Sequence, residues 1–199
     1  MEKGEAALES VDLSKYRNPP WHHKGRGFLV RVLWVYVNGL LLQNPLNPSS
    51  GLKILALRLF GAKIGRGVIL KPSINVKSPW LLEIGDNTWV GEHVWLDTFF
   101  PIKVGSNVCI SQGAYLCTGN HDWTDPAFGL KEWQIVVEEG AWIGARATVL
   151  PGARIASHAV IAGGAVIARA TEPYTVYAGN PAVEVRKRVI KGPHPPDAA

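Results

Sequence analysis

Apolar residues recur every six positions through the second half of this 199-residue chain. Four positions after each of them stands a residue that is usually small, such as Ala147 or Ala153. Three runs show the period: Ile84, Val90 and Leu96; Val104, Ile110 and Leu116; and Val137, Ile143, Val149, Ile155, Ile161 and Ile167. The period fits neither an isolated helix nor a simple alternating strand, but it is the hexapeptide signature of a parallel β-helix. The predicted fold class is therefore an all-β solenoid, in which three hexapeptides, about eighteen residues, complete one coil.

Glycine often follows the inward-facing aliphatic residue of a hexapeptide. Examples are Gly65, Gly85, Gly91, Gly105 and Gly144. Because glycine tolerates positive φ without steric cost, we expect these residues to form corners of the coil.

The six-residue period slips at three places, and the largest slip predicts a protruding loop. Extra residues separate three pairs of core positions: two between Val76 and Ile84, two between Leu96 and Val104, and fifteen between Leu116 and Val137. The last slip corresponds to a loop over about 118–134. Long loops on a rigid scaffold are favoured places for function.

Segments of different character flank the repeats. Residues 28–42 are mostly apolar, and residues 52–60 carry apolar residues at helical spacing before Gly61, a plausible C-cap; the sequence NPLNPSSG separates the two segments. We expect a helical N-terminal segment over 1–62 that caps the β-helix, the β-helix over 63–172 with its inserted loop, and a C-terminal extension and tail over 173–199. The apolar segment is too short and too interrupted for a confident transmembrane helix. Contact of its Trp34 and Tyr36 with a membrane surface is the alternative to a purely capping role.

Composition narrows the possible classes of protein. With 47% hydrophobic and 19% charged residues, the chain is not disordered, and its net charge of +5 favours a solvated basic face or an anionic ligand or lipid surface. No recognised nucleic-acid-binding motif accompanies this charge. Cys109 and Cys117 form no metal-ligand pattern and suggest no disulfide framework. Because the first residues lack the features of a secretory signal, a cytoplasmic location is expected.

The predicted loop opens with the sequence CTGNHDW, which places His121 where the chain leaves the coil. An imidazole titrates near neutrality, so His121 is a candidate general base, the alternative being an ordinary loop histidine bonded to backbone. Either Asp122 or Asp97 is a candidate for orienting its ring, and the sequence does not decide between them.

Several long strings make the chain resemble a known family. They are QNPLNPSSGLK, LRLFGAKIG, IGDNTWVGEHVWLD, VCISQGAYLCTGNHDW, GAWIGARATVLPG and YAGNPAVEVRKR, between about Tyr16 and Arg188. The chain resembles the hexapeptide-repeat acyltransferases, and most closely the colanic acid biosynthesis and related exopolysaccharide O-acetyltransferases. The resemblance implies a left-handed β-helix, a homotrimer, an acyl-CoA donor bound between neighbouring solenoids, and a loop histidine acting as general base, which matches His121.

The resemblance also implies candidate contacts to the donor, acetyl-CoA. Alignment with galactoside and maltose acetyltransferases places them on the last coils. They are Ala145, Gly163, Ala168, Arg169 and Arg186. Small residues and backbone groups would line the pantetheine arm, and the two arginines would meet phosphates.

On the acceptor side the chain departs from the galactoside enzymes, which carry Asn at the position of Gly91 and Asp at that of Phe99. In the closer family, the residues around the loop supply other candidates for contact with the acceptor. They are His93, Trp95, Asn120 and Trp123, with Asp97 beside them. The alternatives are a solvent-facing wall for the polar residues and packing between subunits for the aromatic ones.

The predicted function is acetyl-CoA-dependent O-acetylation of a sugar hydroxyl in an exopolysaccharide precursor, with no metal. The apolar segment 28–42 extends this to a hypothesis of a lipid-linked acceptor at the inner membrane surface. N-acylation of an amino sugar and a non-catalytic scaffold subunit are alternatives. A γ-type carbonic anhydrase fits poorly, because only His93 and His121 are plausible zinc ligands, and Pro126 stands where a further histidine is expected.

Overall fold

The computed structural model describes residues 10–19 and 26–192, and its short strands form three main sheets. Sheet A contains β1 (Lys63–Ile64), β4 (Leu82–Ile84), β7 (Ile102–Val104), β12 (Ile135–Val137) and β15 (Arg154–Ile155). Sheet B contains β2 (Ile69–Leu70), β5 (Trp89–Val90), β8 (Cys109–Ile110), β13 (Trp142–Ile143), β16 (Val160–Ile161), β18 (Thr175–Ala178) and β19 (Val183–Lys187). Sheet C contains β3 (Asn75–Val76), β6 (Trp95–Asp97), β9 (Tyr115–Cys117), β14 (Thr148–Val149) and β17 (Val166–Ile167).

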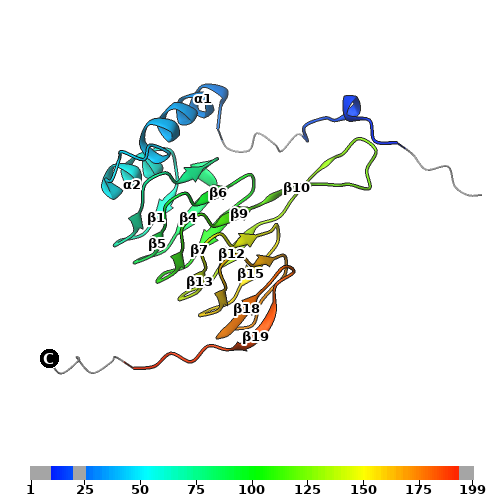
Figure 1. The fold of residues 1–199 in the computed structure, drawn as a ribbon. Helices are drawn as coiled ribbons and strands as arrows, with labels where there is room; N and C mark the ends of the chain where they lie inside the picture. The colour runs from blue at the N-terminus through cyan, green and yellow to red at the C-terminus, as the bar shows by residue number, and fades with distance from the viewer. Residues whose placement is uncertain (1–9, 20–25, 193–199) are drawn as a thin grey trace, which may run out of the picture.

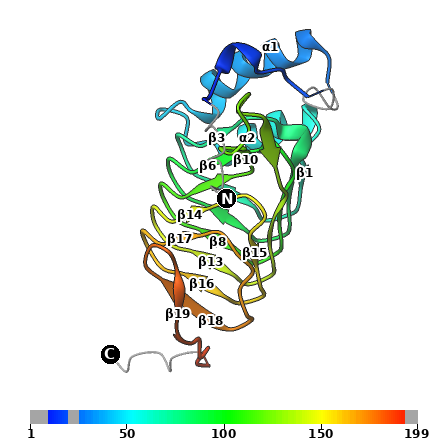
Figure 2. The same ribbon diagram turned by 90° about the vertical axis from the view of Figure 1, so that its right-hand side faces the viewer.

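The three sheets form the walls of one solenoid. The chain visits sheets A, B and C in rotation, so each coil adds one short strand to each wall (Figures 1 and 2). Equivalent strands of adjacent coils pair in parallel, as Trp95 pairs with Tyr115. The fold is the left-handed parallel β-helix that the sequence predicted.

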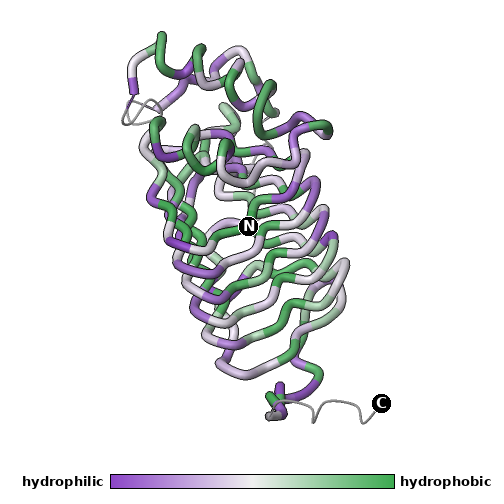
Figure 3. Tube along the Cα trace, turned by 90° about the vertical axis from the view of Figure 1, so that its left-hand side faces the viewer, coloured by the Kyte–Doolittle hydropathy of each residue, from purple (hydrophilic) through white to green (hydrophobic). Residues whose placement is uncertain are grey.

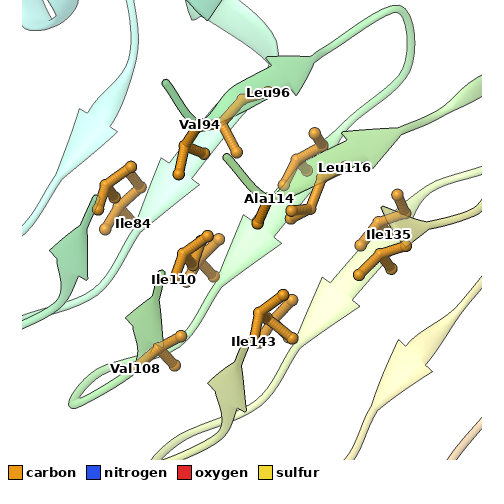
Figure 4. Packing of buried hydrophobic residues seen from close by; sticks show 14 of the residues in the cluster. Ile84, Val94, Leu96, Val108, Ile110, Ala114, Leu116, Ile135 and Ile143 are labelled. Atoms are coloured by element: carbon orange, nitrogen blue, oxygen red, sulfur yellow. The ribbon is translucent and has the colours of Figure 1, made fainter. Parts of the chain in front are cut away.

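The periodic aliphatic residues stack inside the solenoid as a ladder. Leu96, Leu116 and Val149 occupy the same register position in three successive coils, and each is at most 1% exposed. Figure 4 shows Leu96 and Leu116 pointing into the interior, where the small side chain of Ala114 is also buried. Burying a large aliphatic side chain stabilises a protein by about 1.5–3 kcal/mol, so the ladder is the main source of stability.

The expectation of positive φ at the five glycines that follow aliphatic residues was wrong. A Cβ on Gly144 would lie 2.5 Å from the backbone nitrogen of Gly163, and the other four glycines face the next coil in the same way. The left-handed residue of the hexapeptide comes two positions later instead. It is Gly67, Asn87, His93, Asn107 and Arg146 in the corresponding hexapeptides. Glycine at the earlier position therefore allows close approach of coils, and a different residue turns the corner.

All three slips in the period fall at one corner, where the chain passes from sheet C to sheet A. The first forms the short 3-10 helix η3 (Pro79–Leu81), and the second forms the loop 98–101. The third is an antiparallel hairpin of β10 (Gly119–His121) and β11 (Leu130–Glu132), which protrudes from the coil (Figure 1). The insertions thus form a single side of the molecule.

Helices cover the N-terminal end of the solenoid (Figures 1 and 3). They are α1 (Phe28–Val37), its π-helical continuation η2 (Asn38–Leu42), and α2 (Ser50–Leu59). The 3-10 helix η1 (Leu13–Lys15) lies instead beside the hairpin of β10 and β11 (Figure 1). Ser49 caps α2 by accepting a hydrogen bond from the Leu52 backbone, and Gly61, at φ +97°, ends it. Trp34 is 2% exposed and donates its Nε1–H to the carbonyl of Val76 at 2.8 Å. Helix α1 thus supplies a hydrogen-bond donor to a backbone carbonyl in the edge strand of the first coil.

The C-terminal segment closes the other end of the solenoid. Strand β18 pairs in parallel with β16, and β19 folds back on it in an antiparallel hairpin. Tyr177 and Ala182 are buried and extend the core into this hairpin. The last residues of the expected tail, 193–199, lie outside the described residues.

Candidate active site

The protruding hairpin is anchored to the solenoid by a buried threonine. The hydroxyl of Thr118 donates to the carbonyl of Asp97 at 2.8 Å and accepts from the backbone N–H of Phe100 at 2.7 Å. On the returning strand, the backbone N–H of Trp133 donates to the Thr118 carbonyl at 3.1 Å. These bonds fix the base of the hairpin beside the end of β6.

His121, at the end of β10, is held by a backbone carbonyl. Its Nδ1 lies 2.8 Å from the carbonyl oxygen of Phe128, and the two rings stack at 4.6 Å between centroids. Because a carbonyl only accepts hydrogen bonds, Nδ1 carries the proton in the neutral ring. The lone pair is then on Nε2, which is the arrangement a general base needs.

The carbonyl of Phe128 is itself fixed by a turn around Asp125. The carboxylate of Asp125 accepts from the backbone N–H groups of Ala127 and Gly129 at 2.9 and 2.8 Å. Its carbonyl accepts from the N–H of Phe128 at 2.8 Å, and Phe128 adopts a φ of +54°. A non-glycine residue in this region needs such support from its surroundings, so the turn determines where the carbonyl points.

Asp122 belongs to the hairpin itself. Its carboxylate forms an ion pair with Lys131 at 2.6 Å and accepts from the Thr124 hydroxyl at 2.6 Å and its backbone N–H at 3.0 Å. The bonds from Lys131 and Thr124 lower the pKa of Asp122 to about 2. The expectation that Asp122 or Asp97 orients the imidazole is therefore corrected, because the Phe128 carbonyl occupies the position at Nδ1.

Asp97 lies at the foot of the hairpin within a polar cluster on the outer face of sheet C. It is 7% exposed, forms an ion pair with Lys77 at 3.1 Å and accepts a hydrogen bond from the Tyr115 hydroxyl at 3.3 Å. Cys117 pairs with it in register, and the thiol donates to the carbonyl of Gly119 at 3.1 Å. Burial, aided by the neighbouring Cys117 and Asp97, raises the pKa of Tyr115, so its hydroxyl stays protonated and donates.

Beside this cluster two aromatic rings form a flat surface. Trp95 and Tyr115 lie one coil apart in register, and their rings stack with centroids 4.7 Å apart and an angle of 29°. Trp95 remains 41% exposed. An aromatic face next to a buried carboxylate can hold a ligand that has both an apolar face and hydroxyl groups.

A segment from the start of the chain also reaches the histidine. The backbone N–H of Asp12 donates to the carbonyl of Pro126 at 2.8 Å, and the ring of Tyr16 lies 5.9 Å from that of His121. The proximity of Tyr16 to His121 was not predicted, because nothing in the sequence connects residues 10–19 with a loop a hundred residues later. Lys77 was also missed, although it precedes Asp97 by the same twenty residues that separate Trp95 from Tyr115.

The remaining acceptor candidates do not form one cluster within a single chain. His93 is exposed and occupies the left-handed position at the corner between sheets B and C, whereas the hairpin leaves from the corner between C and A. Trp123 is 79% exposed on the hairpin, and Asn120 uses its side-chain oxygen to accept from the His121 backbone at 2.8 Å. Within residues 10–19 and 26–192, no three His, Cys, Asp or Glu side chains gather in a way that could hold a metal ion.

The donor candidates fall into separate groups. Ala145 and Gly163 lie in adjacent coils at the corner between sheets B and C, where the Gly164 N–H donates to the Ala145 carbonyl at 2.8 Å. Ala168 and Arg169 follow β17 at the corner between C and A, and the Arg169 guanidinium donates to the Ala182 carbonyl at 3.3 Å. Arg186 lies in β19 opposite Val176. One chain alone thus does not bring all five candidates to one place.

Comparison with known proteins agrees with this solenoid. Residues 134–169 match the family model described as bacterial transferase hexapeptide (six repeats). Among curated proteins, the chain is 35% identical over 178 residues to the Escherichia coli (strain K12) protein named "Putative colanic acid biosynthesis acetyltransferase WcaF", covering 89% of this chain and 97% of the relative. A Shigella flexneri protein of the same name matches equally well.

Solved structures show the same fold. A hexapeptide-repeat-containing acetyltransferase from Vibrio cholerae O1 biovar eltor, complexed with acetyl coenzyme A, gives a TM-score of 0.73 at 20% identity and covers 85% of this chain and 97% of that one. A galactoside acetyltransferase in complex with coenzyme A gives a TM-score of 0.71 at 19% identity, covering 80% of each chain. The fold defines the class of left-handed β-helix proteins built from hexapeptide repeats. Within that class, the chain belongs to the hexapeptide-repeat acetyltransferase family that includes the WcaF proteins.

Proposed function

We propose that this chain is an acetyl-CoA-dependent O-acetyltransferase that acts on a sugar hydroxyl of an exopolysaccharide precursor, with His121 as the general base. The observation that carries the proposal is the contact of Nδ1 with the Phe128 carbonyl, which leaves Nε2 to accept a proton. The related protein named for colanic acid biosynthesis and the solved relatives with bound acetyl-CoA or CoA support the choice of acceptor and donor.

In the proposed reaction, Nε2 takes the proton of the acceptor hydroxyl as its oxygen attacks the thioester carbonyl of acetyl-CoA. The new C–O bond forms, the C–S bond breaks, and the protonated Nε2 returns its proton to the leaving thiolate. The Phe128 carbonyl accepts from Nδ1 throughout, so the ring keeps its orientation and its transient positive charge is stabilised. No covalent intermediate with the enzyme is required.

The acceptor would lie against the outer face of sheet C. Trp95 and Tyr115 offer an aromatic surface to the apolar face of a sugar ring. Asp97 next to them is a hydrogen-bond acceptor, and its carboxylate forms an ion pair with Lys77 at 3.1 Å. This combination favours a sugar over a purely apolar acceptor.

The donor site and the remaining acceptor candidates are proposed to be completed by neighbouring chains of a homotrimer. The separation of Ala145 and Gly163 from Ala168 and Arg169 supports this, because a second solenoid beside the first would bring two corners together. We expect light scattering to give about three times the chain mass of 21.7 kDa. A monomer that still transfers acetyl groups would show that one chain forms the whole site.

The function is tested with purified protein, acetyl-CoA and a panel of nucleotide-activated sugars and oligosaccharides. We expect saturable binding of acetyl-CoA by calorimetry, release of free thiol only in the presence of an acceptor, and a product that gains one acetyl group. Hydroxylamine should remove this group, because it cleaves esters and leaves amides intact. An amide product would replace O-acetylation by N-acetylation, and absence of acetyl-CoA binding would contradict the proposal as a whole.

A further inference from the structure

The helix that caps the solenoid is apolar on both of its faces, but the solenoid covers only one. Its inner face is docked through Trp34, which is buried, and through Asn38, which donates to the side chain of Asn75 at 2.8 Å. The outer face carries four large side chains at helical spacing that are 56–80% exposed: Leu29, Leu33, Tyr36 and Leu40. Helices that are apolar all round are normally covered on every side, so this outer face needs an occupant.

The same part of the chain carries a strong positive charge. Residues 13–82 contain eleven Lys and Arg and no Asp or Glu, whereas the rest of the chain has ten Lys and Arg against sixteen Asp and Glu. Several of these positive groups have partners within the chain: Lys53 donates to the Asn47 carbonyl at 2.7 Å and Arg58 to the Ile64 carbonyl at 2.8 Å. Lys63 and Lys77 form ion pairs with Glu83 and Asp97 of the next coil. Others, including Arg66 and Lys71, are exposed. The capping end is therefore both apolar and basic, and the remainder of the molecule is net acidic.

We propose that this end docks on an anionic lipid bilayer, as at the inner face of a cytoplasmic membrane, with the outer face of α1 and η2 among the lipids. Apolar side chains insert into the boundary between headgroups and acyl chains, Tyr36 has the amphipathic ring typical of that boundary, and basic groups attract anionic headgroups. Among the described residues, no helix is long and apolar enough to cross a membrane. The helix accordingly lies on the bilayer.

Charge decides between a bilayer and a second copy of the same surface. Two such ends placed face to face would bring together two segments that each carry eleven Lys and Arg and no Asp or Glu of their own. An anionic bilayer instead satisfies both the apolar face and the charge, and it repels the net acidic remainder, which orients the solenoid away from the lipids.

This orientation also determines where the candidate active site lies relative to the membrane. Only this part of the inference rests on the proposed function. In both ribbon views the hairpin of β10 and β11 projects toward the end of the molecule that carries α1 (Figures 1 and 2). Docking through α1 would thus hold His121 on the side of the molecule nearer the membrane, where an acceptor sugar attached to a lipid is accessible. The docking itself does not depend on acetyl transfer.

Flotation of the full chain with lipid vesicles tests the docking. We expect the protein to float with phosphatidylglycerol vesicles, to stay behind with phosphatidylcholine vesicles, and to be released as salt is raised. The double variant Leu29→Glu, Leu33→Glu should lower the bound fraction by roughly tenfold or more, because it places two charges among the lipids. The matched control Val189→Glu, Ile190→Glu changes two exposed apolar residues at the opposite end and should bind as the unmodified chain does.

Three results would overturn the docking proposal. The first is failure of the unmodified chain to float with phosphatidylglycerol vesicles, and the second is equal binding by the Leu29→Glu, Leu33→Glu variant. The third is a molar mass, measured without lipid, that is lower for this variant than for the unmodified chain and the control variant. The last result would show that another copy of the chain covers the outer face. Acetyl transfer to a soluble sugar, measured in parallel, should be the same in both double variants. Loss of docking with retained transfer would leave the proposed function standing.

Discussion

Replacing His121 by alanine is expected to lower kcat for acetyl transfer by about 10²–10⁴-fold, the usual contribution of a general base. The affinity for acetyl-CoA should change little, because the proposed role of Nε2 is toward the acceptor hydroxyl and no donor candidate contacts the ring. Stopped or continuous assay of thiol release gives kcat, and calorimetry on the same variant gives the dissociation constant. The combination separates loss of chemistry from loss of binding.

A second histidine provides the control for this experiment. His158 stacks on Tyr174 with centroids 4.6 Å apart and lies at the corner between sheets A and B, away from the hairpin. His158→Ala should keep kcat, although it removes a stacking contact. If His121→Ala retained kcat within a few-fold, the base would have to be another group, and the buried carboxylate of Asp97 would be the next to replace.

The position of His121 could be predicted because the repeat makes departures from it visible. A histidine at the point where fifteen extra residues interrupt a regular ladder stands out from the sequence alone. The partner of His121 cannot be recognised in the sequence, because the group at Nδ1 is a backbone carbonyl and every residue of the loop has a backbone carbonyl. Only the turn around Asp125 determines that the carbonyl of Phe128 is the one that arrives there.

The same reasoning applies to Asp122, one of the two carboxylates that the sequence offered as a partner for the imidazole. An aspartate that follows a histidine in sequence suggests a pair, but Asp122 comes just after the end of β10 and its carboxylate bonds Lys131 and Thr124 instead. The hairpin register places Asn120 opposite Lys131, and this brings the Lys131 ammonium to the carboxylate of Asp122. Register within an insertion is not encoded in the hexapeptide period, so the sequence could not supply it.

The sequence predicted the solenoid and its inward-facing positions, but it did not show why glycine recurs in the hexapeptides. The period fixes which side chains face inward, and all of the expected core positions are buried. Glycine in the repeat is compatible with two explanations, a left-handed backbone or a close neighbour, and composition does not distinguish them. In the structure, Gly144 has a close backbone neighbour in the next coil, and the left-handed residue is Arg146.

Replacing Gly144 by alanine is therefore expected to destabilise the protein by more than about 4 kcal/mol, in the range reserved for exceptional single changes. A methyl group there would lie 2.5 Å from the nitrogen of Gly163 and 2.7 Å from the carbonyl oxygen of Ile161, and neither backbone atom can rotate away. The two coils must separate to remove this steric clash. Their separation lengthens the hydrogen bond from the Gly144 N–H to the Ile161 carbonyl, which is 2.7 Å in the structure. Each coil is supported only by its neighbours, so no other contact compensates.

Denaturant unfolding measures the effect, with Gly39→Ala as the matched control. Gly39 lies in the helical segment η2, and a Cβ there would meet nothing within 4 Å. Alanine at that position should stabilise the chain by about 0.5–1 kcal/mol, because it restricts the unfolded backbone and favours the helix. If Gly144→Ala cost no more than an ordinary surface change, close approach of the coils would not be the reason for glycine at this position. A large loss at Gly144 together with a gain at Gly39 would show that the repeat selects glycine for the space between coils.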